Sequence, residues 1–400
     1  MPKTYMSGRT LFLLTIAAAI VAANAYYVHP IIGRVAIEFG VDQAIVGAVP
    51  AFNQIALALG IFLIMPLGDR ISNRRLVLIC LAAQVAALTI MALATDFWLF
   101  VAGSTLLGFF TITPYLLPAY TSKRVEPARL GHATAMLSTG VVAGLLLSRT
   151  GSGLIAEMFG WRTVYWVALG LMTTATAILP FLLEEREEQT KRDLPSYPQL
   201  IGSLLPLARQ YPQTLISGSI QGLSFGIFLT VWLGIGLHLT SPEVGLGTDM
   251  VGYLAGVSAL SLFTTPRLGK LADRIGARRM RLYVAMVQCF GICLLPLVGN
   301  SYWLILIPIT ISSTAGPMID ITGRMTCLNQ AGDIRTRLMT IYVTIMFIGG
   351  GIGSWIATIS YDFGGWMGTC IAAFTLSVLV VILSAWQARA QKHDEVPAIN

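Results

Sequence analysis

Long apolar stretches, separated by short polar breaks, run along nearly the whole chain. Each stretch approaches the roughly 20 residues that a helix needs to cross about 30 Å of hydrocarbon. The pattern predicts twelve membrane-spanning helices, at 10–32, 44–67, 76–95, 97–120, 131–158, 162–183, 213–239, 249–268, 280–299, 302–323, 338–361 and 366–388. The expected fold class is therefore an all-α integral membrane protein.

The composition excludes most soluble classes. Of the 400 residues, 55% are hydrophobic and only 11% are charged, whereas soluble domains carry about 25% charged residues. The 39 glycines and 18 prolines are spread along the chain and are not gathered into linkers. A soluble enzyme, a disordered protein and a nucleic-acid-binding domain are all inconsistent with these values.

The basic residues mark the orientation of the chain in the membrane. The net charge is +7, and nearly all lysines and arginines fall in segments on one side of the predicted spans. Arg34 and Arg162 fall on the other side, and Arg149 lies within a span. The positive-inside rule then places both termini in the cytoplasm. The basic excess thus indicates topology, and no nucleic-acid partner is expected.

The N-terminus also fits a cleaved signal peptide, because Lys3 and Arg9 precede an apolar run and Ala23-Asn24-Ala25 resembles a cleavage site. A first membrane span is favoured, because this segment has a counterpart in the second half. The five cysteines have no metal-site spacing and are interpreted as small apolar residues. Neither a metal nor a cofactor is expected.

The chain contains an internal repeat. Residues 68–75, 159–160 and 10–11 have counterparts 204 positions later, at 272–279, 363–364 and 214–215. A repeat of six spans in the same orientation is typical of carriers that bind substrate between two halves. The predicted domains are an N-terminal six-helix bundle (1–183), a cytoplasmic connector (184–212) and a C-terminal six-helix bundle with a short cytoplasmic tail (213–400).

The segment Gly269–Arg279, GKLADRIGARR, resembles a loop signature of the major facilitator superfamily, and residues 65–75 form a copy that lacks both signature glycines. Tyr26–Pro30 and Ser148–Gly153 resemble the bacterial efflux branch described as arabinose-efflux or multidrug-like. The resemblance implies twelve helices in two pseudo-symmetric bundles, and transport by alternating access. It also implies a conformational latch at the loop signature; the alternative is that these residues only set topology. The latch residues are Asp69, Arg70, Arg74, Arg75, Asp273, Arg274, Arg278 and Arg279.

Arg149 is the strongest single candidate for function. A charge at membrane depth costs about 2.5–3.5 kcal/mol or more, so it usually faces a cavity or a partner. We expect Arg149 to contact an anionic substrate group or to influence a nearby carboxylate. The alternative is an arginine bonded to helix carbonyls.

Asp320 is the acidic counterpart, about one turn inside the cytoplasmic end of the tenth span. A partly desolvated carboxylate suits proton coupling. The alternative is an i,i+4 pair with Arg324 at the helix end.

Polar and aromatic residues in the spans that line the cavity in this superfamily complete the predicted site. They are Asn24, Tyr27, Tyr115 and Gln221. Tyr27 equally fits an interfacial aromatic belt. His29 and His238 fall near the outer ends of spans, where separate interfacial histidines are favoured over a proton-sensing or metal-binding pair.

These observations predict a secondary transporter that exports a small organic solute, driven by protons. An importer or facilitator of a small metabolite with the same fold is the alternative; a receptor and an intramembrane enzyme are both disfavoured, because no extra soluble domain and no cluster of histidines and carboxylates is present. The expected partners are a small-molecule substrate, protons and the lipid bilayer. The expected form is a monomer in the bacterial cytoplasmic membrane.

Overall fold

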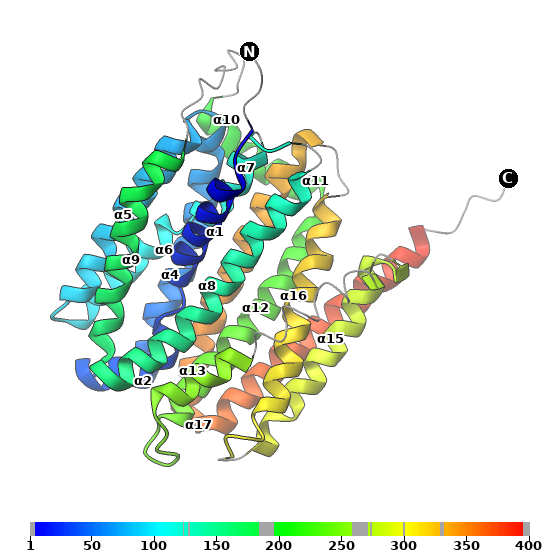
Figure 1. Ribbon diagram of the computed structural model, residues 1–400. Coiled ribbons are helices and arrows are strands. Elements are labelled where there is room, and N and C mark those ends of the chain that lie inside the picture. Colours follow the sequence, from blue (N-terminus) through cyan, green and yellow to red (C-terminus); the bar gives the residue numbers. More distant parts are fainter. Residues whose placement is uncertain are drawn as a thin grey trace. The chain divides into compact units, whose positions relative to one another are not determined.

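The structure of the chain is a computed structural model, and its regular elements are helices (Figure 1). It describes residues 5–122, 124–126, 129–183, 196–257, 271–272, 274–298, 301–328 and 332–394. The chain divides into two compact units. Unit 1 comprises Met1–Val41, Ala48–Ser203 and Gly247–Gly256, and unit 2 comprises Asp42–Gly47, Leu204–Leu246 and Val257–Asn400.

Unit 1 is built mainly from the spans of the first half of the chain. Its elements are α1 (Gly8–Ala23), α2 (Val28–Phe39), α4 (Ala48–Ile64), the 3-10 helix η1 (Met65–Asp69), α5 (Asn73–Leu93), α6 (Phe97–Phe110), α7 (Thr113–Ser122), α8 (Leu130–Phe159), α9 (Trp161–Leu182), α10 (Tyr197–Gly202) and nearly all of α13 (Thr248–Val257).

Unit 2 is built mainly from the second half. Its elements are α3 (Gln43–Val46), α11 (Leu204–Gln210), α12 (Pro212–Leu239), α15 (Ala277–Cys293), η4 (Leu295–Val298), α16 (Leu306–Leu328) and α17 (Gly332–Asp394).

Hydropathy located ten of the twelve predicted spans, and residues 258–268 of the eighth lie outside the described residues. Within the described residues, nine helical stretches are long and apolar enough to cross a membrane, and the last of them, Ile334–Arg389, covers two predicted spans. The break between those two lies at Gly364 and Gly365, and Gly365 has a φ of 55°. Only glycine adopts such a conformation at little cost.

Several predicted spans are interrupted, among them the first and the fourth. The first divides into α1 and α2 at residues 24–27, and the fourth divides into α6 and α7 at residues 111–112. Pro30 is the third residue of α2 and Pro114 is the second residue of α7. Proline is tolerated in the first turn of a helix, because the amide hydrogen that it lacks has no intrahelical acceptor there.

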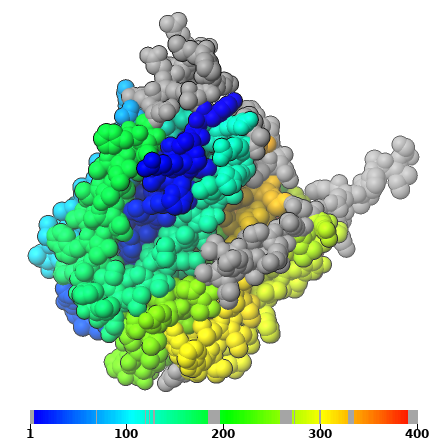
Figure 2. Space-filling view, in the orientation of Figure 1, coloured from blue at the N-terminus to red at the C-terminus, as the bar shows by residue number. Residues whose placement is uncertain are grey.

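Glycines bring α1 close to α8 in unit 1. A Cβ atom at Gly140 would lie 2.5 Å from the Thr15 carbonyl oxygen, and one at Gly144 would lie 2.1 Å from that of Ala19. In the space-filling view α1 lies between α8 and α9 (Figure 2). Gly140 and Gly144 thus form a small-residue face on α8 that permits close backbone approach.

Glycines act in the same way between α12 and α17 in unit 2. A Cβ atom at Gly349 would lie 2.4 Å from the carbonyl oxygen of Gly222, and one at Gly353 would lie 2.3 Å from Cα of Gly226. Gly349 and Gly353 thus form a second small-residue face, on α17.

Candidate functional site

Arg149 lies on α8 in the interior of unit 1, with none of its surface exposed. Its Nε and Nη2 atoms lie 3.2 and 2.9 Å from Nδ1 of His29 on α2. A guanidinium group only donates hydrogen bonds, so Nδ1 is the acceptor. His29 is therefore neutral in this arrangement, with its hydrogen on Nε2.

Tyr26 completes this cluster. Its ring centroid lies 5.3 Å from Cζ of Arg149 and 5.5 Å from the His29 ring, which it meets edge to face. Tyr26 is 8% exposed and His29 is fully buried. Cation–π attraction of a desolvated pair is worth about 2 kcal/mol. We call His29, Arg149 and Tyr26 the Arg149 cluster.

The break between α1 and α2 positions the cluster. Residues 24–27 form turns between the two helices, and Tyr26 lies in the break while His29 is the second residue of α2. The close approach of α1 to α8 at Gly144 holds this part of the chain against the helix that carries Arg149. His29 was expected to be an isolated interfacial histidine; the structure places it beside the buried arginine.

Through Gln84, hydrogen bonds connect the break between α1 and α2 to the break between α6 and α7. Asn24 Nδ2 donates to Gln84 Oε1 at 3.0 Å, and Gln84 Nε2 donates to the Phe110 carbonyl oxygen at 2.9 Å. Phe110 is the last residue of α6, where carbonyl groups lack intrahelical donors. Asn24 thus has a structural partner in addition to its predicted role at the site.

The other predicted polar residues occupy different settings. Tyr27 is 8% exposed and Tyr115 is half-buried. Gln221 is buried on α12 in unit 2, and no hydrogen-bond partner for its Oε1 lies among the described residues. Gln54 on α4 was not predicted; it is fully buried, and within the same part of the chain neither of its amide atoms has a partner. The sequence signal that could have identified Gln54 is a glutamine within the apolar run of the second predicted span.

Asp320 in unit 2 forms the pair that its sequence spacing allowed. Arg324 Nε lies 2.8 Å from Asp320 Oδ2. The Tyr342 hydroxyl donates to Asp320 Oδ1 at 3.0 Å, and the Arg324 guanidinium lies 5.8 Å from the centre of the Tyr342 ring. Asp320 therefore sits between a cation and a hydroxyl donor, and its role in proton coupling stays a prediction.

Arg281 on α15 is a second buried arginine. The distribution of basic residues predicts that it belongs to a cytoplasmic segment, and its side chain is fully buried in unit 2. It donates to Ser217 Oγ at 3.0 Å and to Thr326 Oγ1 at 3.2 Å, and also to Gln387 and Thr322. These acceptors come from α12, α16 and α17. The sequence signal for its burial is its position one residue inside the predicted ninth span.

The latch residues are only partly described. Asp273 and the side chain of Asp69 lie outside the described residues. The two loop copies end on equivalent residues, since Ser72 caps α5 by accepting from the Arg75 amide at 3.4 Å and Gly276 precedes α15. Arg274 and Arg279 are exposed. The latch role therefore stays a prediction.

The end of α8 is tied to α13 inside unit 1. Glu157 accepts hydrogen bonds from the Thr248 amide at 3.0 Å and from its hydroxyl at 3.1 Å, and it forms an ion pair with Arg34. Thr150 Oγ1 donates to the Gly252 carbonyl oxygen at 3.0 Å. A carboxylate at a helix N-terminus satisfies unpaired amides and complements the helix dipole. We call these contacts the α8–α13 clasp.

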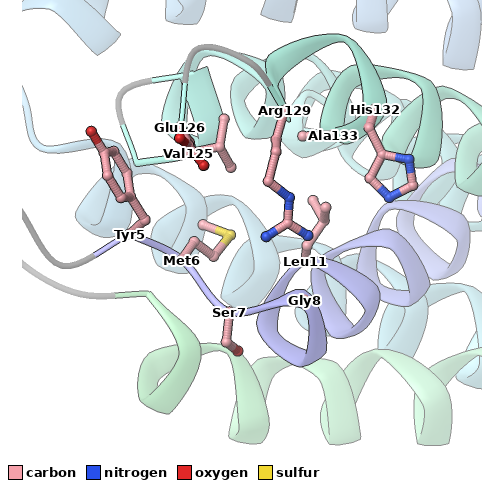
Figure 3. A pocket seen from close by; sticks show the side chains of 10 residues that line it. All are labelled: Tyr5, Met6, Ser7, Gly8, Leu11, Val125, Glu126, Arg129, His132 and Ala133. Atoms are coloured by element: carbon pink, nitrogen blue, oxygen red, sulfur yellow. The ribbon is translucent and has the colours of Figure 1, made fainter.

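A small pocket lies at the N-terminal ends of α1 and α8 (Figure 3). Glu126, Arg129 and His132 are the titratable residues of α8 and the segment before it that line the pocket, and the Arg129 side chain extends toward α1. Twenty residues of helix separate Arg129 from Arg149, which is about 30 Å at 1.5 Å per residue. The pocket is therefore distinct from the Arg149 cluster.

The family model described as Major Facilitator Superfamily matches residues 14–329 and 214–399. The chain belongs to the major facilitator superfamily. The predicted family and fold class, two pseudo-symmetric bundles of six helices, are thereby confirmed. The chain is a multi-pass membrane transporter, and this family is generally not enzymatic.

Relatives and solved structures agree with this family. The chain is 26% identical over 393 residues to "Uncharacterized transporter YgaY" of Escherichia coli O157:H7, covering 96% of this chain and 97% of that one. It is 23% identical over 337 residues to "Multidrug resistance protein MdtG" of Citrobacter koseri, covering 83% and 82%. A crystal structure of the nucleoside transporter NupG has a TM-score of 0.76 at 13% identity, covering 94% and 98%. At that identity the likeness concerns the fold alone.

Proposed function

We propose that this membrane transporter exports a small organic solute with an acidic group, in exchange for protons, and that Arg149 contacts that group. The observation that carries the proposal is a fully buried guanidinium held by His29 and Tyr26 inside unit 1. A charged group at membrane depth is retained where it serves a ligand or a charge pathway. The likeness to a multidrug resistance protein of Citrobacter koseri supports export.

The rest of the predicted mechanism belongs to the same proposal. The N-terminal bundle (1–183) and the C-terminal bundle (213–400) rock about a site near the membrane midplane, with both termini in the cytoplasm. Asp320 exchanges protons, Asn24, Tyr27, Tyr115 and Gln221 line the path, and the two loop copies latch the cytoplasmic side. The transporter acts as a monomer in the bacterial cytoplasmic membrane.

Import of a small metabolite is the second candidate. The same fold occurs in a nucleoside transporter, and this likeness concerns the fold alone. The direction in which solute moves across the membrane under an imposed pH gradient distinguishes import from export.

A thermal-shift screen of the purified protein tests the role of Arg149. A ligand at about 100 times its dissociation constant stabilises a folded protein by about 2.7 kcal/mol. We expect small organic acids to raise the melting temperature of the wild type, and Arg149→Ala to abolish that shift while remaining folded. Arg34→Ala, which removes an arginine outside the cluster, is the control. An unchanged shift in Arg149→Ala contradicts the role of Arg149.

A further inference from the structure

His29 carries a hydrogen-bond donor with no acceptor among the described residues. Its Nδ1 accepts from Arg149, so its hydrogen must lie on Nε2. Nε2 is fully buried, and no hydrogen-bond partner for it lies among the residues that the structure describes. Leaving a buried donor unsatisfied costs about 1–3 kcal/mol, so the residue is maintained in this place against a cost.

The geometry at Nδ1 permits either Arg149 or a proton, but not both. The lone pair of Nδ1 points between two guanidinium nitrogens at 3.2 and 2.9 Å. A hydrogen on Nδ1 would meet those two donors head on and would place two positive charges in contact within a buried environment. Like charges in contact strongly destabilise one another when they are shielded from water. Protonation of His29 therefore requires Arg149 to move away.

Within the part of the chain that the structure describes, the charged residues of the helices packed against α2, apart from Arg149, form ion pairs away from His29. The elements packed against α2 are α4, α8 and α9. The segment Ala48–Ile64 of α4 contains no titratable residue. Glu157 of α8 pairs with Arg34, and Arg162 of α9 pairs with Glu38, both toward the far end of α2. The uncharged titratable residues of these segments include Tyr26 beside the ring, Tyr27 at the N-cap of α2 and Tyr165 on α9.

We propose that His29 is a second proton-binding residue of the transporter, and that a proton and Arg149 compete for its Nδ1 atom. Neutral His29 holds the Arg149 guanidinium in place for the acidic group of the solute. Proton uptake at Nδ1 breaks both hydrogen bonds and releases the guanidinium, so that the solute loses its contact. This inference rests on the proposed function, and it adds a proton site in unit 1 to Asp320 in unit 2.

Nitrogen NMR tests the proposal without any solute. The full chain is reconstituted in lipid bilayers with nitrogen-15 in histidine and arginine, and spectra are recorded from about pH 8.5 to about pH 5, which spans the range where histidines ordinarily titrate. His29→Gln and Arg149→Lys identify the two sets of signals. His132, an exposed histidine on the same helix as Arg149, is the internal control.

We expect His29 to carry its hydrogen on Nε2 at high pH, and its Nδ1 signal to shift on acidification at the same pH at which the Arg149 Nε signal shifts. Any change of the His132 signals with pH should leave the Arg149 signal unmoved. In His29→Gln, whose amide oxygen is an acceptor that takes no proton, the Arg149 signal should stay constant with pH. Any of three results overturns the proposal: an Nδ1–H form at high pH, protonation of His29 without a change at Arg149, or a His29 that stays neutral throughout. None of these results depends on transport, so they are distinguishable from failure of the proposed function.

Discussion

Gly153 on α8 faces Thr248 at the start of α13, and the Gly153 backbone contacts both the backbone and the side chain of Thr248. A Cβ atom at Gly153 would lie 2.4 Å from the Thr248 carbonyl oxygen. In return, Thr248 Oγ1 donates to the carbonyl oxygen of Gly153 at 2.9 Å. The α8–α13 clasp therefore has no room for a side chain at position 153.

Gly153→Val should separate α13 from α8, because contact below 3 Å requires the backbone to shift. Gly151→Val is a matched control, since a Cβ atom there would meet nothing within 4 Å. Ser152 is 1% exposed, so a cysteine at this position is shielded as long as the helices stay together. Ser152→Cys, introduced into a chain whose native cysteines have been replaced, therefore detects separation of α13 from α8. We expect a membrane-impermeant maleimide to label the cysteine at least several-fold faster in the variant that combines Ser152→Cys with Gly153→Val than in the variant that combines it with Gly151→Val. Equal labelling rates would show that the clasp does not depend on this contact.

Arg149→Lys should lose transport of the organic acid to the same extent as Arg149→Ala. Lysine keeps the charge but lacks the paired nitrogens that donate to His29 Nδ1. Transport of an organic acid found by the thermal-shift screen should fall at least about tenfold in both variants, which corresponds to 1.4 kcal/mol, with normal abundance in the membrane. Flux in Arg149→Lys equal to the wild-type flux would mean that charge alone suffices.

Asp320→Asn should uncouple flux from the pH gradient. The substitution removes the exchangeable proton but leaves an amide that fits between Arg324 and Tyr342. We expect downhill flux to continue and its dependence on an imposed pH difference to fall. If pH dependence is unchanged and only stability falls, by about 0.5 kcal/mol as for an i,i+4 pair, Asp320 is a helix-end partner of Arg324 and no more.

Arg281→Met should destabilise the protein, because several buried acceptors on α12, α16 and α17 lose their donor at once. We expect the free energy of unfolding, measured by denaturant titration in lipid, to fall by about 2–4 kcal/mol. Arg279→Met, on the exposed side of the same helix, should change it by no more than about 0.5 kcal/mol. Similar losses in the two variants would contradict a structural role for Arg281.

The predictable part of this molecule follows from local sequence. Hydropathy located the spans because a helix in hydrocarbon must satisfy its backbone internally and present apolar side chains along its whole length. The repeat and the loop signature then gave the family. Arg149 was found for the same reason, since a single charge within an apolar run is conspicuous.

The missed features depend on contacts between distant segments. His29 and Arg149 are 120 residues apart, and no local pattern reveals which polar residue faces a buried cation. The interruption of the first span at residues 24–27 positions both Tyr26 and His29, yet it carries no glycine and its proline lies further on. The assignment of residues 247–256 to unit 1 is likewise a packing result that hydropathy does not contain.

Solute uptake into inverted membrane vesicles tests proton-driven export most directly. The vesicles are loaded to be acidic inside, so that their interior represents the cell exterior, and an organic acid from the screen is supplied outside. Export coupled to protons predicts accumulation that collapses when the gradient is dissipated and that is absent in Arg149→Ala. Accumulation that requires an alkaline interior, or that proceeds equally without a gradient, would contradict proton-driven export.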